Sequence, residues 1–155
     1  MPSIEGLMAT DMISAAPDET VAEVAKRMSR NHIGAMLVVE NGAISGLFTE
    51  RDLLDRVTAR NRNPKETRVA EVATREVVTV DASQPVQEVL ALFRAKKFRH
   101  LPVTKGGKLV GILSTRDLLA YSVEVLERYI IELKYNRELA EGVDPYDHFG
   151  GSYGR

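Results

Sequence analysis

Two short stretches of the chain carry the same chemically useful side chains at the same spacing. The first runs from Gly46 to Asp52 (GLFTERD) and the second from Gly111 to Asp117 (GILSTRD). Each places a hydroxyl, an arginine and an aspartate within four residues. An arginine offers a forked donor to phosphate oxygens, and a carboxylate can accept hydrogen bonds from neighbouring hydroxyls such as those of a ribose. The combination favours a site for a nucleoside phosphate.

The same residues also suit plain helix capping. Thr49 and Ser114 have the hydroxyl preferred at an N-cap, and Asp52 and Asp117 follow three residues later. Such a cap contributes about 1 kcal/mol. A strand that enters a helix start would in addition leave backbone N–H groups free to bind an anion. The capping and binding interpretations are compatible, and both stay open at this point.

The repetition extends well beyond the two motifs. Gly111 follows Gly46 by 65 positions, and from Val21 onward the same offset aligns the two halves without a gap. Turn, cap and core positions coincide together, which indicates a tandem repeat. The identical pairs are Val21/Val86, Glu23/Glu88, Val24/Val89, Val38/Val103, Gly42/Gly107, Gly46/Gly111, and Arg51 to Leu54 with Arg116 to Leu119.

Each repeat reads as a β-α-β-β-α unit. In the first, Thr20 and Glu23 have the spacing of a capping box before an apolar helix face. The continuous apolar run 35–39 predicts a buried strand. Asn41-Gly42 then predicts a tight hairpin turn into a returning strand over 44–48. Gly106-Gly107 occupies the same place in the second repeat.

These elements define the expected domains and fold class. A repeat of this size buries too little apolar surface to be stable alone. We therefore expect an α+β fold in which two pseudo-symmetric repeats pack sheet to sheet, with the two motifs at the rim of that contact. The expected segments are a first repeat (1–57), a linker (58–67), a second repeat (68–122), a long C-terminal helix (123–141) and a flexible tail (142–155).

Composition narrows the classes of function. The 155 residues are 44% hydrophobic and 28% charged, with a net charge of −1 and no cysteine. A balanced charge provides no long-range attraction for nucleic acid or an anionic membrane. Without cysteine there is no disulfide, thiolate nucleophile or thiolate-bound zinc. No apolar run reaches the roughly 18 residues of a membrane span, and no signal peptide is evident, so we expect a soluble, cytoplasmic protein.

The sequence from about Ile4 to Ser122 resembles a tandem pair of CBS domains, also called a Bateman module. The resemblance is carried by the two Gly-h-h-Thr/Ser-x-x-Asp signatures (h, apolar), by the apolar strand before each tight turn, and by the segment 99–103 (RHLPV). It implies a regulatory module for signal transduction that binds AMP, ADP, ATP, or in some members NAD or S-adenosylmethionine. We expect no enzyme activity, no obligatory cofactor and no metal site.

The resemblance also implies the binding residues. Asp52 and Asp117 would hold ribose hydroxyls, with the hydroxyl and arginine residues of each signature near ribose or phosphate. The base would lie between the start of a strand and the extended segment before the first helix of a repeat. The implied residues are Thr49, Arg51, Asp52, Ser114, Thr115, Arg116 and Asp117 from the signatures; Ala35, Met36, Arg99, His100, Leu101 and Pro102 from the strand starts; and Ser14, Ala15, Thr79 and Val80 from the extended segments.

The two implied sites differ in charge. Gly34-Ala35 in the first repeat stands where the second has Arg99-His100. We therefore expect the second site to prefer a charged phosphate tail. Of the other histidines, His32 is expected to end a helix and His148 lies in the tail. No spacing typical of metal ligands or of a nucleophile with its base is present.

The C-terminal segment predicts one long helix. Leu119, Val123, Leu126, Ile130, Leu133 and Ala140 follow heptad-like spacing. The helix could pack on its own domain or against a second subunit, and the resemblance favours a homodimer. A ligand-independent dimerisation module, whose signatures only cap helices, is the competing class. A hydrolase is disfavoured because no catalytic constellation is evident.

Overall fold

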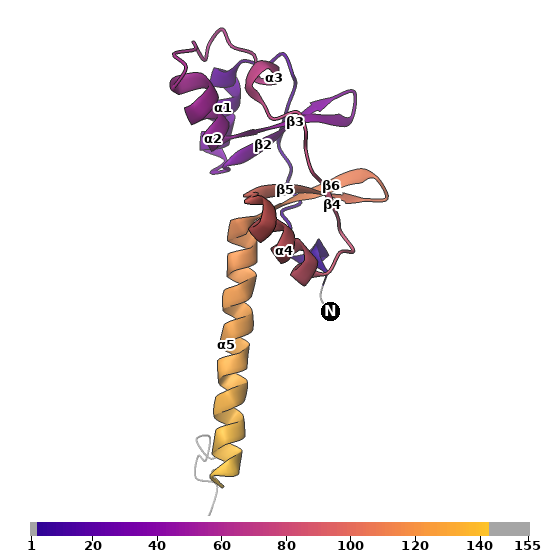
Figure 1. Cartoon of the computed structure of the whole chain (residues 1–155), viewed down its shortest axis with the longest axis vertical. Coiled ribbons are helices and arrows are strands. Elements are labelled where there is room, and N and C mark those ends of the chain that lie inside the picture. Colours follow the sequence, from indigo (N-terminus) through magenta and orange to yellow (C-terminus); the bar gives the residue numbers. More distant parts are fainter. Residues whose placement is uncertain (1–2, 143–155) are drawn as a thin grey trace, which may run out of the picture. The chain divides into compact units, whose positions relative to one another are not determined.

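A computed structural model describes residues 3–142 of the chain (Figure 1). It divides into two compact units, one extending to Thr115 and the other beginning at Arg116. The elements are a 3₁₀ turn (Ile4–Gly6), β1 (Ser14–Ala15), α1 (Val21–Arg30), β2 (Ala35–Glu40), β3 (Ala43–Thr49), α2 (Glu50–Asp52) continued by a π-helical turn (Leu53–Thr58), α3 (Val69–Val72), β4 (Val80–Asp81), α4 (Val86–Lys96), β5 (His100–Lys105), β6 (Lys108–Ser114) and α5 (Thr115–Ala140). The expected tail lies outside the described residues except for Gly142.

The first unit contains two three-stranded sheets with the same topology. In one, β1 runs parallel to β2 and β2 pairs antiparallel with β3; in the other, β4, β5 and β6 repeat this order. The pairing is equivalent in detail, since Ala15 faces Val38 as Val80 faces Val103. These paired repeats and the long C-terminal helix confirm the predicted α+β fold.

The predicted hairpin turns connect β2 to β3 and β5 to β6. Asn41 and Gly42 have φ angles of 50° and 78°, and Gly106 and Gly107 have 58° and 79°. Two successive residues with positive φ give the turn whose twist matches the flanking strands. The two turn residues therefore set the pairing beside each turn, and a register shift follows between Val38 and Val39 in one hairpin and between Val103 and Thr104 in the other.

The apolar faces of the two sheets meet in one cluster. Its buried members Ala35, Leu37 and Leu47 come from β2 and β3, and β6 contributes Leu109 and Ile112. This contact confirms the predicted sheet-to-sheet packing. A second cluster fills the first repeat beneath α1, where Phe48, Val21 and Val24 are fully buried.

The two repeats exchange their leading segments, which was not predicted. Val69 and Val72 of α3 belong to the core of the first repeat. At the other end of the chain, the Ile4 N–H donates to the Gln84 carbonyl beside α4. The Thr67 carbonyl accepts from the Val21 N–H, so the end of the linker docks on the start of α1. Each repeat is therefore completed by residues from the other half of the sequence.

The exchanged segments cross the sheets at the signature glycines. Leu47 and Thr74 bond reciprocally through their backbones, with both N···O distances 2.9 Å, and Ala9 and Ile112 do the same at 2.9 and 3.0 Å. A Cβ on Gly46 would lie 3.1 Å from the Thr74 carbonyl oxygen. At Gly111 it would lie 2.8 Å from the Ala9 carbonyl oxygen and 2.6 Å from Met8 Sδ. Glycine is required here because two backbones approach closely.

Gly111→Ala should lower the free energy of unfolding by about 1–3 kcal/mol, because the added methyl group overpacks a backbone crossing held by two hydrogen bonds. Gly6→Ala provides the matched control, since a Cβ there meets nothing within 4 Å. Urea denaturation of both variants measures the difference. Equal stability of the two would contradict the crossing as the reason for glycine.

The start of α3 also makes stability depend on pH. The Arg68 N–H donates to Glu71 at 2.7 Å and holds the pKa of that carboxyl below its ordinary value of 4.5, with Arg62 adding to the effect. A lowered pKa in the folded state stabilises the protein above the unfolded value and is lost as pH falls through the folded value.

Glu71→Gln should therefore destabilise the protein at pH 7 more than at pH 3. Wild type loses this contribution in acid, whereas the variant lacks it throughout. Urea midpoints at the two pH values measure the effect, and a stability difference that is the same at both would refute it.

Candidate functional site

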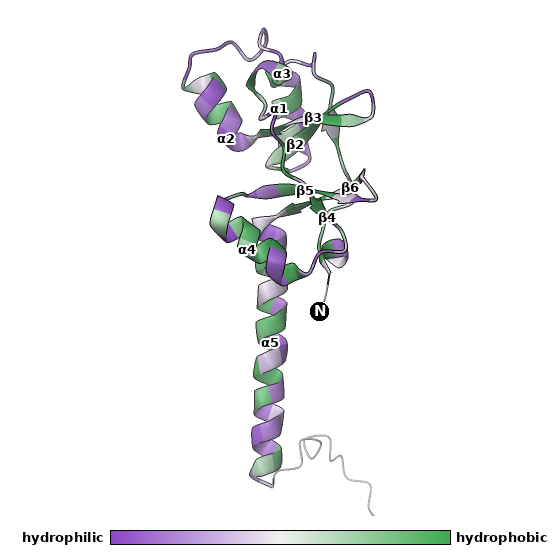
Figure 2. Cartoon of the chain, turned by 45° about the vertical axis from the view of Figure 1, so that its right-hand side comes forward, coloured by the Kyte–Doolittle hydropathy of each residue, from purple (hydrophilic) through white to green (hydrophobic). Residues whose placement is uncertain are grey.

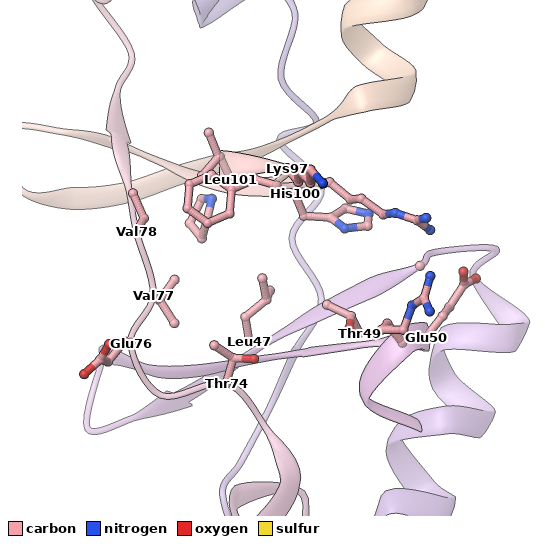
Figure 3. Close-up of a pocket in the computed structure, with 15 residues that line it drawn as sticks. Leu47, Thr49, Glu50, Thr74, Glu76, Val77, Val78, Lys97, His100 and Leu101 are labelled. Atoms are coloured by element: carbon pink, nitrogen blue, oxygen red, sulfur yellow. The ribbon is translucent and has the colours of Figure 1, made fainter. Parts of the chain in front are cut away.

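A cleft of about 500 Å³ lies between the two repeats of the first unit (Figure 3). The first repeat supplies the end of β3 and the start of α2. The second supplies the segment before β4 and the connection from α4 into β5. The lining residues are Gly34, Leu47, Thr49, Glu50, Arg51, Thr74, Glu76, Val77, Val78, Lys97, Phe98, Arg99, His100, Leu101 and Pro102.

Apolar side chains gather toward one end of the cleft, where Glu76 also lies, and most of the charged side chains gather toward the other. In Figure 3, Val77 and Val78 lie on the opposite side of the cleft from Thr49 and Glu50, with Leu47 between them. Lys97 and His100 face Thr49 and Glu50 from the second repeat. An apolar slot beside convergent polar groups is the usual composition of a small-molecule site.

Three lining side chains carry a fixed positive charge. Arg51, Lys97 and Arg99 are exposed, and His100 is half-buried beside them. The lining carboxylates are Glu50 and Glu76. Since the chain as a whole is nearly neutral, this local excess of cations is what could attract an anion here.

The backbone places Lys97 and Arg99 at the cleft. Lys97 ends α4 in the left-handed conformation, with φ of 53°, and His32 has the same φ at the equivalent place after α1. The Arg99 carbonyl accepts from the Thr115 N–H at 3.0 Å, as the Gly34 carbonyl accepts from the Glu50 N–H at 3.0 Å. Each signature therefore holds the residue that precedes a central strand of its own repeat.

The first signature forms a closed capping box. The Thr49 N–H and hydroxyl donate to Asp52 Oδ2 at 3.0 and 3.1 Å, and the Asp52 N–H donates to Thr49 Oγ1 at 3.2 Å. Arg56 Nε lies 3.4 Å from Asp52 Oδ1. Asp52 is only 6% exposed. The Glu50 N–H is bonded to the Gly34 carbonyl, so the amides of Thr49, Glu50 and Asp52 all have partners within the protein.

Six of the residues implied by the resemblance line the cleft together, namely Thr49, Arg51, Arg99, His100, Leu101 and Pro102. The structure therefore combines the signature of the first repeat with the strand start of the second. Arg99 and His100 line this cleft together with Thr49, Glu50 and Arg51, whereas the residues of the second signature are not among its lining. The expected pairing of Arg99 and His100 with the second signature stays a prediction.

The other implied residues lie outside the lining of this cleft. Ala15, Met36 and Val80 are buried, Ala35 belongs to the contact between sheets, and Asp52 lies beneath the capping box. The Ser14 carbonyl accepts from Arg27 at 2.7 Å. The remaining residues are Thr79, which is exposed before β4, and Ser114, Thr115, Arg116 and Asp117 at the end of β6 and the start of α5.

Several lining residues were not predicted. Thr74 and the residues 76–78 line the cleft in place of Thr79 and Val80, because the exchanged segment crosses at Thr74 before it reaches β4. Lys97 was not predicted either. The signal that could have found it is its equivalence with His32, because each follows the first helix of its repeat and precedes a strand. Nothing local in the sequence marks Leu47 or Phe98 as a cleft residue.

Within residues 3–142 no cluster of histidine, aspartate and glutamate has a geometry that could hold a metal ion. Over the same residues, no helix is both long enough and apolar enough to cross a membrane.

Comparison with known proteins agrees with this architecture. The model of the CBS domain family matches residues 4–59 and 69–124. The CBS domain-containing protein YhcV of Bacillus subtilis is 33% identical over 118 residues, which cover 76% of this chain and 84% of that protein.

Solved structures extend the likeness. A CBS-domain protein of Burkholderia ambifaria MC40-6, assigned to signal transduction, is 33% identical, covers 79% of this chain and 95% of its own, and has a TM-score of 0.76. The hexameric CBS-CP12 protein of bloom-forming cyanobacteria is 25% identical, covers 94% and 90%, and has a TM-score of 0.72. With two matched repeats over most of its length, this chain belongs to the CBS domain family.

Proposed function

We propose that this protein is a regulatory binding module, and not an enzyme, that senses an adenosine-containing nucleotide in the cleft between its repeats. One observation carries the proposal: an apolar slot and a cationic end are joined in a single cleft built by both repeats. Its volume of about 500 Å³ lies within the usual range for small-molecule sites, about 300–1,000 Å³.

The two ends of the cleft suit the two ends of a nucleotide. Leu47, Val77 and Val78 provide apolar contact for a purine. Arg51, Lys97 and Arg99 provide donors for phosphate, and an arginine can bind two phosphate oxygens at once. AMP, ADP and ATP are the first candidates, with NAD and S-adenosylmethionine as further members of the same class.

Binding would act by shifting a conformational equilibrium. A nucleotide that touches both repeats favours the arrangement in which both sets of contacts are made. At about 100 times its dissociation constant, a ligand specific for that arrangement stabilises it by roughly 2.7 kcal/mol. This is enough to change the state of an attached partner.

The partner we propose is a further copy of this chain. The CBS-CP12 protein, which is similar over nearly the whole chain, is hexameric. A cytoplasmic location and the absence of nucleic-acid and membrane partners stay predictions from composition.

The alternative is a ligand-independent interaction module. It is favoured by the capping box, because Thr49 and Asp52 satisfy each other and Asp52 is buried away from the cleft lining. On this alternative the signatures only hold the fold together, and nucleotides have no effect.

Arg99→Ala should weaken binding of AMP and ATP about tenfold or more, because it removes a charged donor to phosphate. Binding of adenosine, which lacks phosphate, should change little. Isothermal titration calorimetry measures all three ligands.

Arg94→Ala is the matched control, since Arg94 is an exposed arginine of the same repeat that does not line the cleft. Equal weakening by the two substitutions would show that phosphate does not reach the cationic end. No response of wild type to AMP, ADP, ATP, NAD or S-adenosylmethionine would favour the ligand-independent alternative.

Asp52→Asn tests whether this aspartate contacts ribose or acts through the cap. Its partners are Thr49 and Arg56, so we expect a loss of about 1 kcal/mol of stability and equal weakening of AMP and 2′,3′-dideoxy-AMP. Calorimetry with both nucleotides gives the comparison. Weakening confined to AMP would instead place the Asp52 carboxylate on the ribose hydroxyls.

A further inference from the structure

The second unit exposes a continuous apolar stripe on α5. Over the described part of the helix, hydrophobic residues recur between hydrophilic ones along its length (Figure 2). The stripe consists of Leu119, Val123, Leu126, Ile130 and Leu133, whose exposed fractions lie between 47% and 64%. Their alternating spacings of four and three residues keep them on one face of a helix. An apolar helix face of this kind is normally buried against other protein surface.

The side chains of the stripe indicate what covers it. In heptad terms Val123 and Ile130 occupy the a positions, and Leu119, Leu126 and Leu133 occupy the d positions. β-Branched residues at a with leucine at d favour two parallel strands, whereas isoleucine at both positions, or leucine at a with isoleucine at d, favours three or four strands. We propose that α5 pairs with α5 of a second copy as a parallel, in-register, two-stranded coiled coil.

The flanking residues are compatible with this register. A parallel pair places each g residue beside the following e residue of the partner. Ser122 then meets Glu127, Tyr129 meets Lys134 and Asn136 meets Glu141, each on the partner subunit. Every pair has at most one charged member and joins a hydroxyl or amide to a charged group. No like charges oppose each other along the flanks.

The seam has a charged a residue on either side of the stripe: Arg116, seven residues before Val123, and Arg137, seven residues after Ile130. Each would face its own counterpart. Arg137 Nε lies 2.9 Å from Glu141 Oε1, so a carboxylate offsets the charge of Arg137. A polar a residue lowers the stability of a coiled coil but fixes its register and number of strands.

Exposed apolar residues also lie on other faces of α5, and they provide controls. Ile131 is 66% exposed but stands next to the stripe, at a b position. It should contribute little to a two-stranded seam, although it would be buried in a larger bundle. Comparing Ile131 with the stripe therefore tests both the interface and the number of strands.

This inference names a surface for the self-association in the proposed function, but it does not require nucleotide in the cleft. Leu126→Lys in the full chain should weaken dimerisation about a hundredfold or more, and Ile131→Lys should leave it unchanged. Sedimentation equilibrium over a dilution series measures both, and circular dichroism checks that each variant is folded. A wild type that is monomeric at 50 μM, or a dimer that Leu126→Lys does not weaken, overturns the proposal.

A single introduced cysteine tests whether the two α5 helices run parallel. The result is unambiguous because the chain has no cysteine of its own. Ala140→Cys lies at a d position near one end of α5. Mild oxidation should link nearly all chains in pairs if the helices are parallel and in register. Ile131→Cys should not link. An antiparallel or shifted pair leaves Ala140→Cys unlinked, and a trimer leaves one chain in three unlinked; either result overturns the proposal.

Nucleotide titration of Leu126→Lys separates the two proposals. Retained binding with a lost dimer supports the seam independently of the cleft. Absent binding in wild type together with an intact, cross-linkable dimer refutes only the nucleotide proposal.

Discussion

The first unit depends on two backbone crossings, in which the leading segment of each repeat lies across the sheet of the other. Both crossings are made by reciprocal hydrogen bonds, and both require a glycine where the chains meet. They place α3 in the core of the first repeat and the N-terminal turn against the second. Neither repeat would have a complete core alone, and the arrangement depends on glycine at positions 46 and 111.

The cleft is a consequence of the same arrangement. The segment that leaves the crossing at Thr74 forms one wall, the end of β3 forms another, and the start of β5 closes the third. Each wall is fixed by backbone bonds rather than by flexible side chains. Such a cleft is largely formed before a ligand enters, which reduces the entropy that binding must overcome. The exposed arginines and lysine then supply charge where the walls end.

Several acidic side chains of this protein cap the starts of helices and do not line the cleft. Glu23 and Glu71 accept hydrogen bonds at the starts of α1 and α3, and Asp52 does so at α2. The same residue types could serve binding or folding, and the difference is made by burial and by existing partners. On α5, by contrast, large apolar side chains remain exposed beside ion pairs such as Arg128 with Glu124.

The sequence by itself determined the duplication, the order of elements, the hairpin turns and the long helix, because these depend on periodicity and on residues such as Asn41-Gly42 that act locally. It also identified Thr49, Arg51 and Arg99 to Pro102 as candidates for one kind of site. The sequence did not determine which signature lines a cleft together with the strand start at residues 99–102. In a tandem repeat, each leading segment could pack on its own repeat or on the other one. Both arrangements have the same local sequence pattern, so only long-range packing distinguishes them. Only the tertiary structure shows that the leading segments are exchanged between the repeats. It also shows that Arg99 and His100 line a cleft with the first signature, and that Asp52 bonds to Thr49 in a helix cap.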